Sequence, residues 1–299
     1  MIHSRHLNRD TVTIFLLHGV EDGVETAVRN YTRKHLPRDY FADFLRDLKA
    51  HGAPVSMDDI VAERRDGTPL PSHAFAITFD DGFENNLSVA APILEEMGIP
   101  ATFYVTTDFI DSNRMSWIDR IEYAVEQRAE GTMDLPWGRR QFGTDAERRA
   151  FLDDVRLQVK STPGLDAEAV ATAIQSQLGF PETWASDHPL DRKLTWDQLG
   201  ELAAPDLFTI GGHTHTHAIL AFLDDETLAW EIDHSLALLR EKAGLAVHHY
   251  SYPEGLAHCY DARTIELLKD RGIVCSPSAI EGENTPDIDL FNLRRIMVV

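Results

Sequence analysis

Short apolar runs alternate along the chain with segments whose apolar residues recur at helical spacing. The runs are bounded by turn residues and rich in β-branched and aromatic side chains, which is typical of strands buried on both faces. Helical spacing follows over 39–48 and 87–97, and Gly98 marks the end of the second helix. This β-α-β-α-β order predicts parallel strands joined by crossover helices. The three runs are 11–17 (TVTIFLL), 74–79 (AFAITF) and 101–106 (ATFYVT).

The pattern changes at about residues 111–194, which are polar and helix-prone and contain no strand-like run. Helical spacing is clear over 145–160 and 166–178. A length of 299 residues allows two domains or one large α/β barrel with an insertion. We interpret the segment as a helical insertion into a single domain that spans 1–299. After it the alternation resumes, with helices at 195–203, 225–243 and 261–271 and strands at 207–210, 248–252 and 273–276.

The charge balance excludes two classes of partner. The chain has 28 Lys and Arg against 49 Asp and Glu, a formal net charge of −21. Nucleic-acid binding and attachment to anionic membranes both rest on cationic contacts, so we expect neither. The first residues lack the continuous apolar region of a signal peptide, and no stretch approaches the roughly 20 apolar residues that span a bilayer. We therefore expect a cytoplasmic protein without membrane insertion.

Two adjacent carboxylates, Asp80 and Asp81, directly follow the apolar run at 74–79. Parallel α/β folds build their active sites at the carboxyl ends of strands. Neighbouring carboxylates at such a position repel each other unless a cation neutralises one, and a metal ion would do so and leave the other free as a base. Taken alone, Asp-Asp-Gly is more typical of a solvated turn, but its position at a strand end favours a functional role.

Three histidines at alternate positions, His213, His215 and His217, follow the predicted strand at 207–210. An i, i+4 pair such as His213 and His217 can converge on one ion if the residues between them turn. Imidazoles together with a carboxylate suit Zn²⁺, Co²⁺ or Ni²⁺, with one position left for water. The alternative is a polar surface loop with incidental histidines. We expect the His215 side chain to point away from the pair, in a supporting role.

A third polar cluster, 251–255 (SYPEG), again lies at the end of a predicted strand. Pro and Gly make this turn rigid, and a backbone N–H beside it would be able to stabilise an oxyanion. Taken alone, the segment is typical of an ordinary turn.

In order and spacing, TFDDG at 78–82, HTHTH at 213–217 and SYPEG at 251–255 resemble the motifs of the polysaccharide deacetylase family. This is the NodB-homology group, also called carbohydrate esterase family four. The resemblance covers most of the chain. It implies a distorted (β/α) barrel of NodB type that carries the helical segment as an insertion. It also implies the metal-dependent hydrolysis of an N-acyl amino sugar.

Carried over residue by residue, the resemblance implies that Asp80 is the general base and that Asp81, His213 and His217 bind the metal. We expect one divalent ion, zinc first, with cobalt, nickel or manganese as alternatives. Such an ion polarises an amide carbonyl and lowers the pKa of bound water from about 15.7 toward 7. Tyr252 falls in the motif whose backbone helps to hold the oxyanion in relatives.

One family motif is absent from this chain. Many relatives supply the general acid from a late Leu-x-x-His motif, whereas this chain ends LFNLRRIMVV, without a histidine there. Our first candidate for the acid is His258, just after SYPEG, and the second is His18, at the end of the first strand. Glu254 is a third if burial raises its pKa. Arg295 matches a family-typical arginine that either orients Asp80 by an ion pair or closes the barrel.

Residues that would contact the substrate flank these motifs. Trp117 and Asp119 begin the insertion and suit a sugar-facing wall, because Trp stacks on pyranose rings and carboxylates bind hydroxyls. The alternative is the start of a helix with a core Trp. The third polar cluster would supply another side of the substrate site through Tyr252, Pro253 and Glu254.

We therefore predict a hydrolase that removes an N-acetyl or N-formyl group from an amino sugar in a cytoplasmic glycan precursor, such as one for envelope polysaccharide or O-antigen. The sugar would be nucleotide-linked, lipid-linked or part of an oligosaccharide. Two alternatives compete with this prediction. One is a non-catalytic carbohydrate-binding barrel, which needs no free base. The other is a metal-dependent phosphoesterase, which commonly gathers more ligands around two ions.

Overall fold

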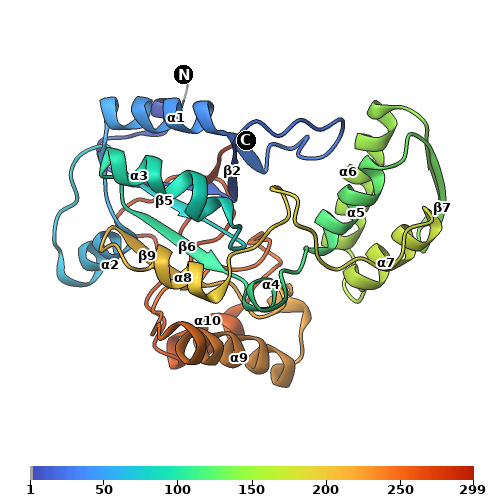
Figure 1. Cartoon of the computed structure of the whole chain (residues 1–299). Coiled ribbons are helices and arrows are strands. Elements are labelled where there is room, and N and C mark those ends of the chain that lie inside the picture. The colour runs from blue at the N-terminus through green and yellow to red at the C-terminus, as the bar shows by residue number, and fades with distance from the viewer. Residues whose placement is uncertain (1–2) are drawn as a thin grey trace.

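A parallel β-sheet forms the centre of the computed structural model, which describes residues 3–299 (Figure 1). Its strands are β1 (Thr13–Leu17), β4 (Ala53–Pro54), β5 (Ala74–Phe79), β6 (Ala101–Val105), β9 (Phe208–Gly212) and β10 (Ile296–Met297). They lie in the order β10–β1–β5–β6–β9, with β4 beside the start of β5, and every pair is parallel. The strands β1, β5 and β6 are buried over their full length. The predicted α/β class and crossover connections are therefore confirmed.

Isolated parallel bridges continue the sheet beyond β9 and close it into a distorted barrel. The strands predicted at 248–252 and 273–276 are therefore single ladder rungs rather than full strands. Pro253 and Pro277 lie at their ends and lack the N–H groups that longer ladders need. The bridges pair Gly212 with Tyr250, His249 with Cys275 and Pro277 with Leu293.

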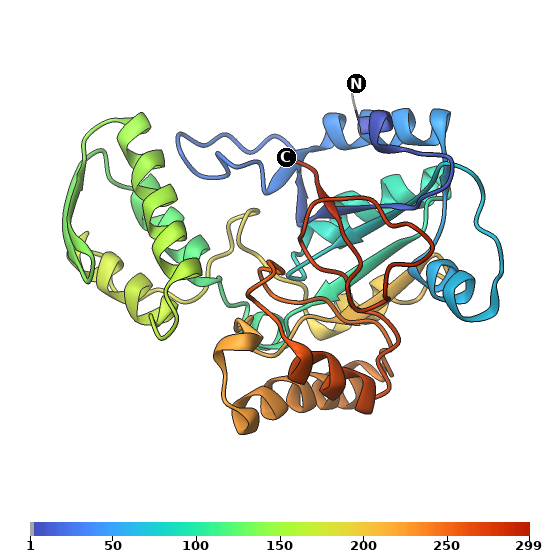
Figure 2. The same cartoon turned by 180° about the vertical axis from the view of Figure 1, so that it is seen from behind.

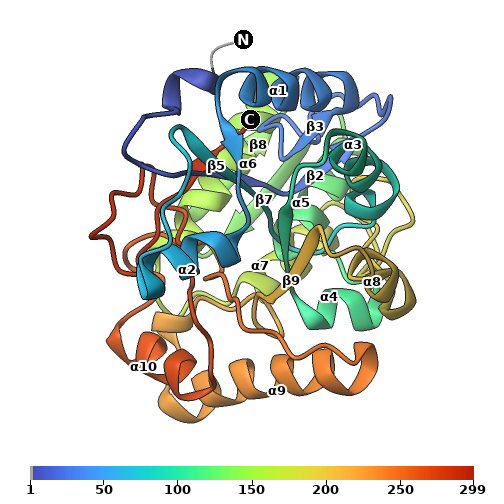
Figure 3. The ribbon, with the colours of Figure 1, turned by 90° about the vertical axis from the view of Figure 1, so that its left-hand side faces the viewer.

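Helices cover the outside of the barrel (Figures 1 and 3). The first of them, α1, buries Phe41, Phe44 and Leu48 against the sheet, in a core that also contains Phe15 of β1. Gly98 ends α3 in the left-handed conformation at φ 61°, which confirms the predicted stop. Within residues 3–299, none of the helices combines the length and apolar character that a bilayer crossing requires. The covering helices are α1 (Arg38–His51), α2 (Met57–Asp66), α3 (Ala91–Met97), α8 (Trp196–Leu202), α9 (Asp225–Ala243) and α10 (Ala262–Asp270).

The insertion lies to one side of the barrel, packed around an apolar core of its own (Figure 2). Ile121, Leu152 and Ile174 are fully buried in this core and come from three different helices. Its elements are α5 (Trp117–Glu126), β7 (Gly131–Leu135), β8 (Gly138–Phe142), α6 (Asp145–Ser161) and α7 (Ala167–Gln177), and α4 (Thr107–Ser112) leads into it from the barrel.

The insertion also contains an antiparallel hairpin of β7 and β8, so the expectation that strands are absent from it is wrong. Buried Met133 and Leu135 alternate with exposed Thr132 and Asp134. Alternation of buried and exposed residues is typical of a strand with one buried face. Here the alternation covers only a few residues in a mostly polar segment, so it is not recognised in the sequence.

A loop near the N-terminus joins the barrel to the insertion. It connects β2 (Gly19–Glu21) with β3 (His35–Pro37) and runs from residue 22 to 34. The carboxylate of Glu126, at the end of α5, accepts hydrogen bonds from three successive backbone N–H groups of this loop, at 2.8, 2.8 and 3.0 Å. Val28 of the loop is buried in the apolar core of the insertion. The loop 22–34 therefore belongs to both parts of the molecule.

Candidate metal centre and active site

The candidate ligands lie at the carboxyl ends of neighbouring parallel strands. Asp80 and Asp81 follow β5, and His213 follows β9, with β6 between the two strands. Asp81 and His217 have positive φ angles of 79° and 64°, which residues other than glycine rarely adopt. Such backbone conformations cost free energy and cluster at functional sites.

A tyrosine shapes the histidine loop. Tyr250 packs so closely against Gly212 that a Cβ at this glycine would lie 2.4 Å from the tyrosine ring. The Tyr250 hydroxyl accepts a hydrogen bond of 2.9 Å from the backbone N–H of Thr214. The Thr214 hydroxyl in turn accepts a hydrogen bond of 2.9 Å from the N–H of His217. Backbone contacts therefore bend the loop so that His213 and His217 face the same point.

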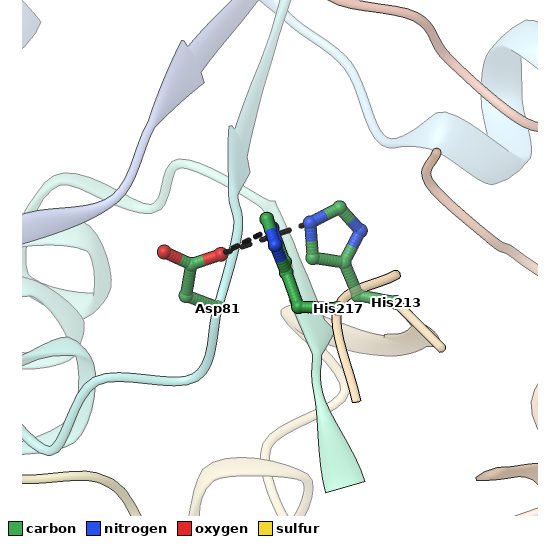
Figure 4. A group of neighbouring side chains, drawn as sticks. All are labelled: Asp81, His213 and His217. Carbon is green, nitrogen blue, oxygen red and sulfur yellow. Dashed lines mark ion pairs between the residues drawn. The ribbon is translucent and has the colours of Figure 1, made fainter. Parts of the chain in front are cut away.

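Asp81, His213 and His217 converge as one candidate metal site (Figure 4). Their ligand atoms lie within 4.8 Å of one another. Oδ1 of Asp81 is 3.3 Å from Nε2 of His217 and 3.7 Å from Nε2 of His213. His215 turns away from the site, toward the Thr107 hydroxyl at 2.9 Å.

These donors fit a divalent metal ion. Oδ1 of Asp81 is buried and accepts no hydrogen bond from the described residues, which is costly for a carboxylate oxygen unless a cation binds it. Nδ1 of His213 donates a hydrogen bond of 2.8 Å to the Ser251 carbonyl, so that the lone pair of Nε2 points at the site. Two imidazoles and one carboxylate form the ligand set of many Zn²⁺ enzymes.

Asp80 stays outside this ligand set and pairs with Arg295. The two guanidinium nitrogens each lie 2.8 Å from one Asp80 oxygen, and Nε of Arg295 donates to the Ser278 carbonyl at 2.7 Å. Burial raises the pKa of Asp80, but the Arg295 charge outweighs it, so the net pKa is below the usual range. Asp80 is therefore an ionised carboxylate, with Oδ2 3.9 Å from Nε2 of His213. Of the two roles left open for Arg295, the structure supports the ion pair.

A cavity of about 280 Å³ opens onto these residues. The barrel lines it with the metal-site residues and with His18, Tyr252 and Glu254. The insertion lines it with Trp117 and with two side chains of α6, Arg156 and Lys160. The site therefore lies between the barrel and the insertion, and the predicted position of Trp117 at a wall of the site agrees with the structure.

His258 and Asp119 do not reach the cavity. His258 is exposed, and its ring nitrogen lies 3.0 Å from the Lys160 carbonyl, outside the cavity wall. Asp119 is buried behind the wall, with its two oxygens each 3.4 Å from a lysine, Lys34 and Lys193. The structure therefore separates both residues from the place where a substrate would bind. Pro253 is also buried, beside the wall rather than in it.

The suggestion that burial raises the pKa of Glu254 enough for acid catalysis is wrong. Burial does raise it, but Lys160 forms an ion pair with this carboxylate, and the net pKa lies below the usual range. His18 is half-buried in the cavity wall, and desolvation there lowers its pKa to about 4. Its ring is therefore neutral near pH 7.

Tyr252 contributes a rigid wall. Its ring stacks on Tyr260 with centroids 3.9 Å apart, and its hydroxyl donates a hydrogen bond of 2.9 Å to the Phe291 carbonyl. Among the residues that the structure describes, the backbone N–H of Tyr252 donates to no protein acceptor. An amide that is fixed and unpaired beside the candidate metal site suits the stabilisation of an oxyanion.

Four residues at or beside the site were not singled out from the sequence. Lys34 contacts Asp81, Lys193 contacts Asp119, Lys160 contacts Glu254, and the Ser251 hydroxyl accepts from Arg295 at 2.9 Å. Ser251 alone lies in a quoted motif. The three lysines come from a loop, a linker and a helix face without a motif, so local sequence could not have indicated them.

Comparison with known proteins agrees with this geometry. The sequence model described as polysaccharide deacetylase matches residues 67–276. The chain belongs to the polysaccharide deacetylase family. This membership makes it a carbohydrate deacetylase of the hydrolase class. No curated protein sequence matches the chain significantly.

Solved structures of deacetylases share the fold of this polysaccharide deacetylase. IcaB from Ammonifex degensii is 18% identical with a TM-score of 0.61, and the alignment covers 98% of this chain and 94% of IcaB. Streptococcus pyogenes deacetylase PplD, in complex with acetate, is 16% identical with a TM-score of 0.62, over 97% and 93% of the two chains. The BpsB deacetylase domain from Bordetella bronchiseptica is 19% identical with a TM-score of 0.59, over 97% and 96%. These similarities confirm the NodB-type barrel.

Proposed function

We propose that this deacetylase uses one divalent metal ion, zinc first, to remove an N-acetyl group from an amino sugar. The observation that carries the proposal is the buried Oδ1 of Asp81, which accepts no hydrogen bond from the described residues and faces the imidazoles of His213 and His217, with Asp80 next to this cluster but outside it. A binding protein would have no use for a free base at this position, whereas hydrolysis of an amide requires one.

The chain supplies the groups for proton transfer. An ion held by Asp81, His213 and His217 would supply the Lewis acid that polarises the amide carbonyl and lowers the pKa of water. Asp80 accepts the proton of the attacking water, because Arg295 holds both of its oxygens in place and keeps it ionised. The Tyr252 amide then stabilises the negative charge that develops on the carbonyl oxygen.

We assign the return of a proton to the leaving amine to His18. Of the described residues that line the cavity, His18 is the one imidazole outside the candidate metal site. Its ring is neutral at rest, so it would pass a proton on rather than store one. One ring nitrogen would take the proton that Asp80 removed from the water, while the other nitrogen gives its own proton to the amine.

The amino sugar belongs to a short glycan or a precursor rather than to the middle of a long polymer. The cavity of about 280 Å³ is slightly smaller than typical ligand pockets, which measure about 300–1,000 Å³. Walls from the barrel and the insertion face each other across it, and the Lys160–Glu254 ion pair joins them. A chain that continued in both directions would have to displace this ion pair. The nucleotide-linked or lipid-linked form, the formyl group as an alternative, and the cytoplasmic location stay predictions.

The test compares Asp80→Asn with the wild-type protein. Both are loaded with Zn²⁺, their metal content is measured, and amine release is followed on short N-acetylated and N-formylated amino sugars, free and nucleotide-linked. We expect Asp80→Asn to keep the metal and to lose about 10²–10⁴-fold in kcat, the usual contribution of a general base.

Two controls make the result decisive. Asp81→Asn should lose the metal, since it removes a ligand. An aryl phosphate assayed in parallel tests for phosphoesterase activity. Full activity of Asp80→Asn would contradict the assigned base, and wild-type protein that binds glycans but never releases amine would favour a carbohydrate-binding barrel.

A further inference from the structure

A half-buried lysine of the cavity wall, Lys34, contacts the candidate metal-binding carboxylate. Nζ of Lys34 lies 2.9 Å from Oδ2 of Asp81, and the Lys34 side chain is 18% exposed. A charge-assisted contact of this length between buried groups is strong and directional. It occupies the oxygen of Asp81 that does not face the two imidazoles.

Lys34 is itself held in place by the two ends of the insertion. Asp119, in the first turn of α5, lies 3.4 Å from Lys34. The other oxygen of Asp119 lies 3.4 Å from Lys193, three residues before α8. Lys193 is fully buried, with its ammonium 3.4 Å from the centre of the Phe83 ring. A chain of alternating charges therefore runs from the insertion to Asp81.

The two oxygens of Asp81 consequently have different environments. Oδ2 has an ammonium partner, whereas Oδ1 is buried without a hydrogen-bond partner among the described residues and points at His213 and His217. A free carboxylate is able to bind a cation through one oxygen or through both. The contact with Lys34 leaves one oxygen available on this carboxylate.

We propose that Lys34 is a positioning residue that reserves Oδ2 of Asp81, so that Asp81 offers a metal ion a single oxygen. The inference rests on the proposed metal dependence. Its consequence is that a coordination position stays open for water and for the carbonyl oxygen, which catalytic zinc sites require. It also gives the insertion a role in the reaction, because Asp119, which Lys193 contacts from the other side, lies beside Lys34.

The experiment replaces Lys34 by Met, which keeps the length but removes the charge, and by Arg, which keeps the charge. The matched control is Lys242→Met, because Lys242 forms an exposed ion pair with Asp111 on the protein surface. Each protein is loaded with Co²⁺, whose visible absorption reports coordination number. The dissociation constant for Zn²⁺ is measured by chelator competition, kcat and KM on an N-acetyl amino sugar are determined, and thermal unfolding checks the fold.

We expect Lys34→Met to change the Co²⁺ spectrum toward a higher coordination number, because the second Asp81 oxygen becomes free. Zn²⁺ binding should not weaken, since a neighbouring positive charge is removed. The value of kcat should fall by about 10–100-fold, as for other residues that orient metal ligands, while KM changes little. Lys34→Arg should restore part of kcat, and Lys242→Met should match the wild type.

A Co²⁺ spectrum of folded Lys34→Met identical to that of the wild type would overturn the inference. So would a Zn²⁺-loaded crystal structure of the wild type with both Asp81 oxygens on the ion, which decides the matter even if Lys34→Met fails to fold. Wild-type protein that takes up no metal would instead overturn the proposed function, so the two failures are distinguishable.

Discussion

The charge state of each aspartate in this site depends on the cation that contacts it. Asp80 and Asp81 are neighbours in the sequence and both are buried, yet Arg295 holds one and Lys34 holds the other. Both carboxylates therefore stay ionised, since each cation outweighs the cost of burial in setting the pKa. Two adjacent aspartates thus have different surroundings, because two cations that are distant in the sequence contact them.

At the same scale, the two histidines considered for the acid give opposite expectations. His18→Asn should lower kcat by about 10²-fold or more, since it removes an imidazole from the cavity wall. His258→Asn should leave kcat unchanged, because this ring is exposed outside the cavity. Steady-state kinetics of the two variants, with metal content measured for each, decides between them. Loss of activity in His258→Asn alone would contradict the assignment of His18.

Among the elements, α2 is joined to the barrel wall by a charged contact. Nε2 of His249 lies 2.7 Å from Oδ1 of Asp58, the second residue of α2, and its Nδ1 lies 3.0 Å from Sγ of Cys275. Burial lowers the pKa of His249, but Cys275 and Asp58 outweigh it and raise the pKa to about 10. Asp58, His249 and Cys275 do not line the cavity that contains Asp80 and Asp81, so this contact can be tested apart from the site.

The raised pKa of His249 predicts how stability depends on pH. A histidine whose pKa is higher in the folded state stabilises fully below its unfolded value of 6.5 and loses this contribution as the pH rises toward 10. Asp58→Asn should therefore reduce the free energy of unfolding by about 1 kcal/mol at pH 6, a value discounted for the exposure of Asp58.

Urea unfolding of wild type and Asp58→Asn at pH 6 and pH 10 measures this difference. The gap between the two proteins should shrink at pH 10. A gap that is constant across this range would show that His249 does not titrate there. Asp59 is unsuitable as a control because it closes the capping box with Ser56, so the exposed Asp66→Asn at the end of α2 serves instead.

On the scale of the whole molecule, the insertion and the barrel have separate apolar cores and meet around the active site. They are joined on one side by the loop 22–34 and on the other by the Lys160–Glu254 ion pair. The insertion therefore forms part of the cavity wall and also contacts Lys34 through Asp119.

This arrangement predicts that Lys160→Ala changes the preferred length of the substrate. Removal of the ion pair should raise the rate on long N-acetylated oligosaccharides relative to the monosaccharide, because one end of the cavity opens. Stability should change by less than about 1 kcal/mol, since the pair is partly exposed. The ratio of kcat/KM across a length series, with Lys242→Ala as control, measures the effect. An unchanged ratio would contradict the proposed preference for short glycans.

Much of the fold was predictable because burial on both faces leaves a plain apolar signal. The runs that became β1, β5 and β6 are of this kind, and Gly98 ended its helix as predicted. The hairpin of β7 and β8 was missed because only one of its faces is buried and its alternation is short. The segments 248–252 and 273–276, which close the barrel through isolated bridges, were expected to be full strands. Apolar content does not reveal that the prolines at their ends limit the number of backbone hydrogen bonds these segments form.

The apolar pattern by itself determined the parallel α/β order, and the resemblance of three motifs to a known family added the barrel. Both directed attention to Asp80, Asp81, His213 and His217, and the carboxyl ends of parallel strands meet at one end of a sheet, which brings these residues together. Only the tertiary structure decided what surrounds them. It brought Lys34 to Asp81, placed His18 inside the cavity and left His258 outside it, and paired Glu254 with Lys160. These contacts join loops and helices far apart in the chain, and local patterns carry no information on such distances. The charge state of a buried group depends on these contacts, so it too was decided by the fold.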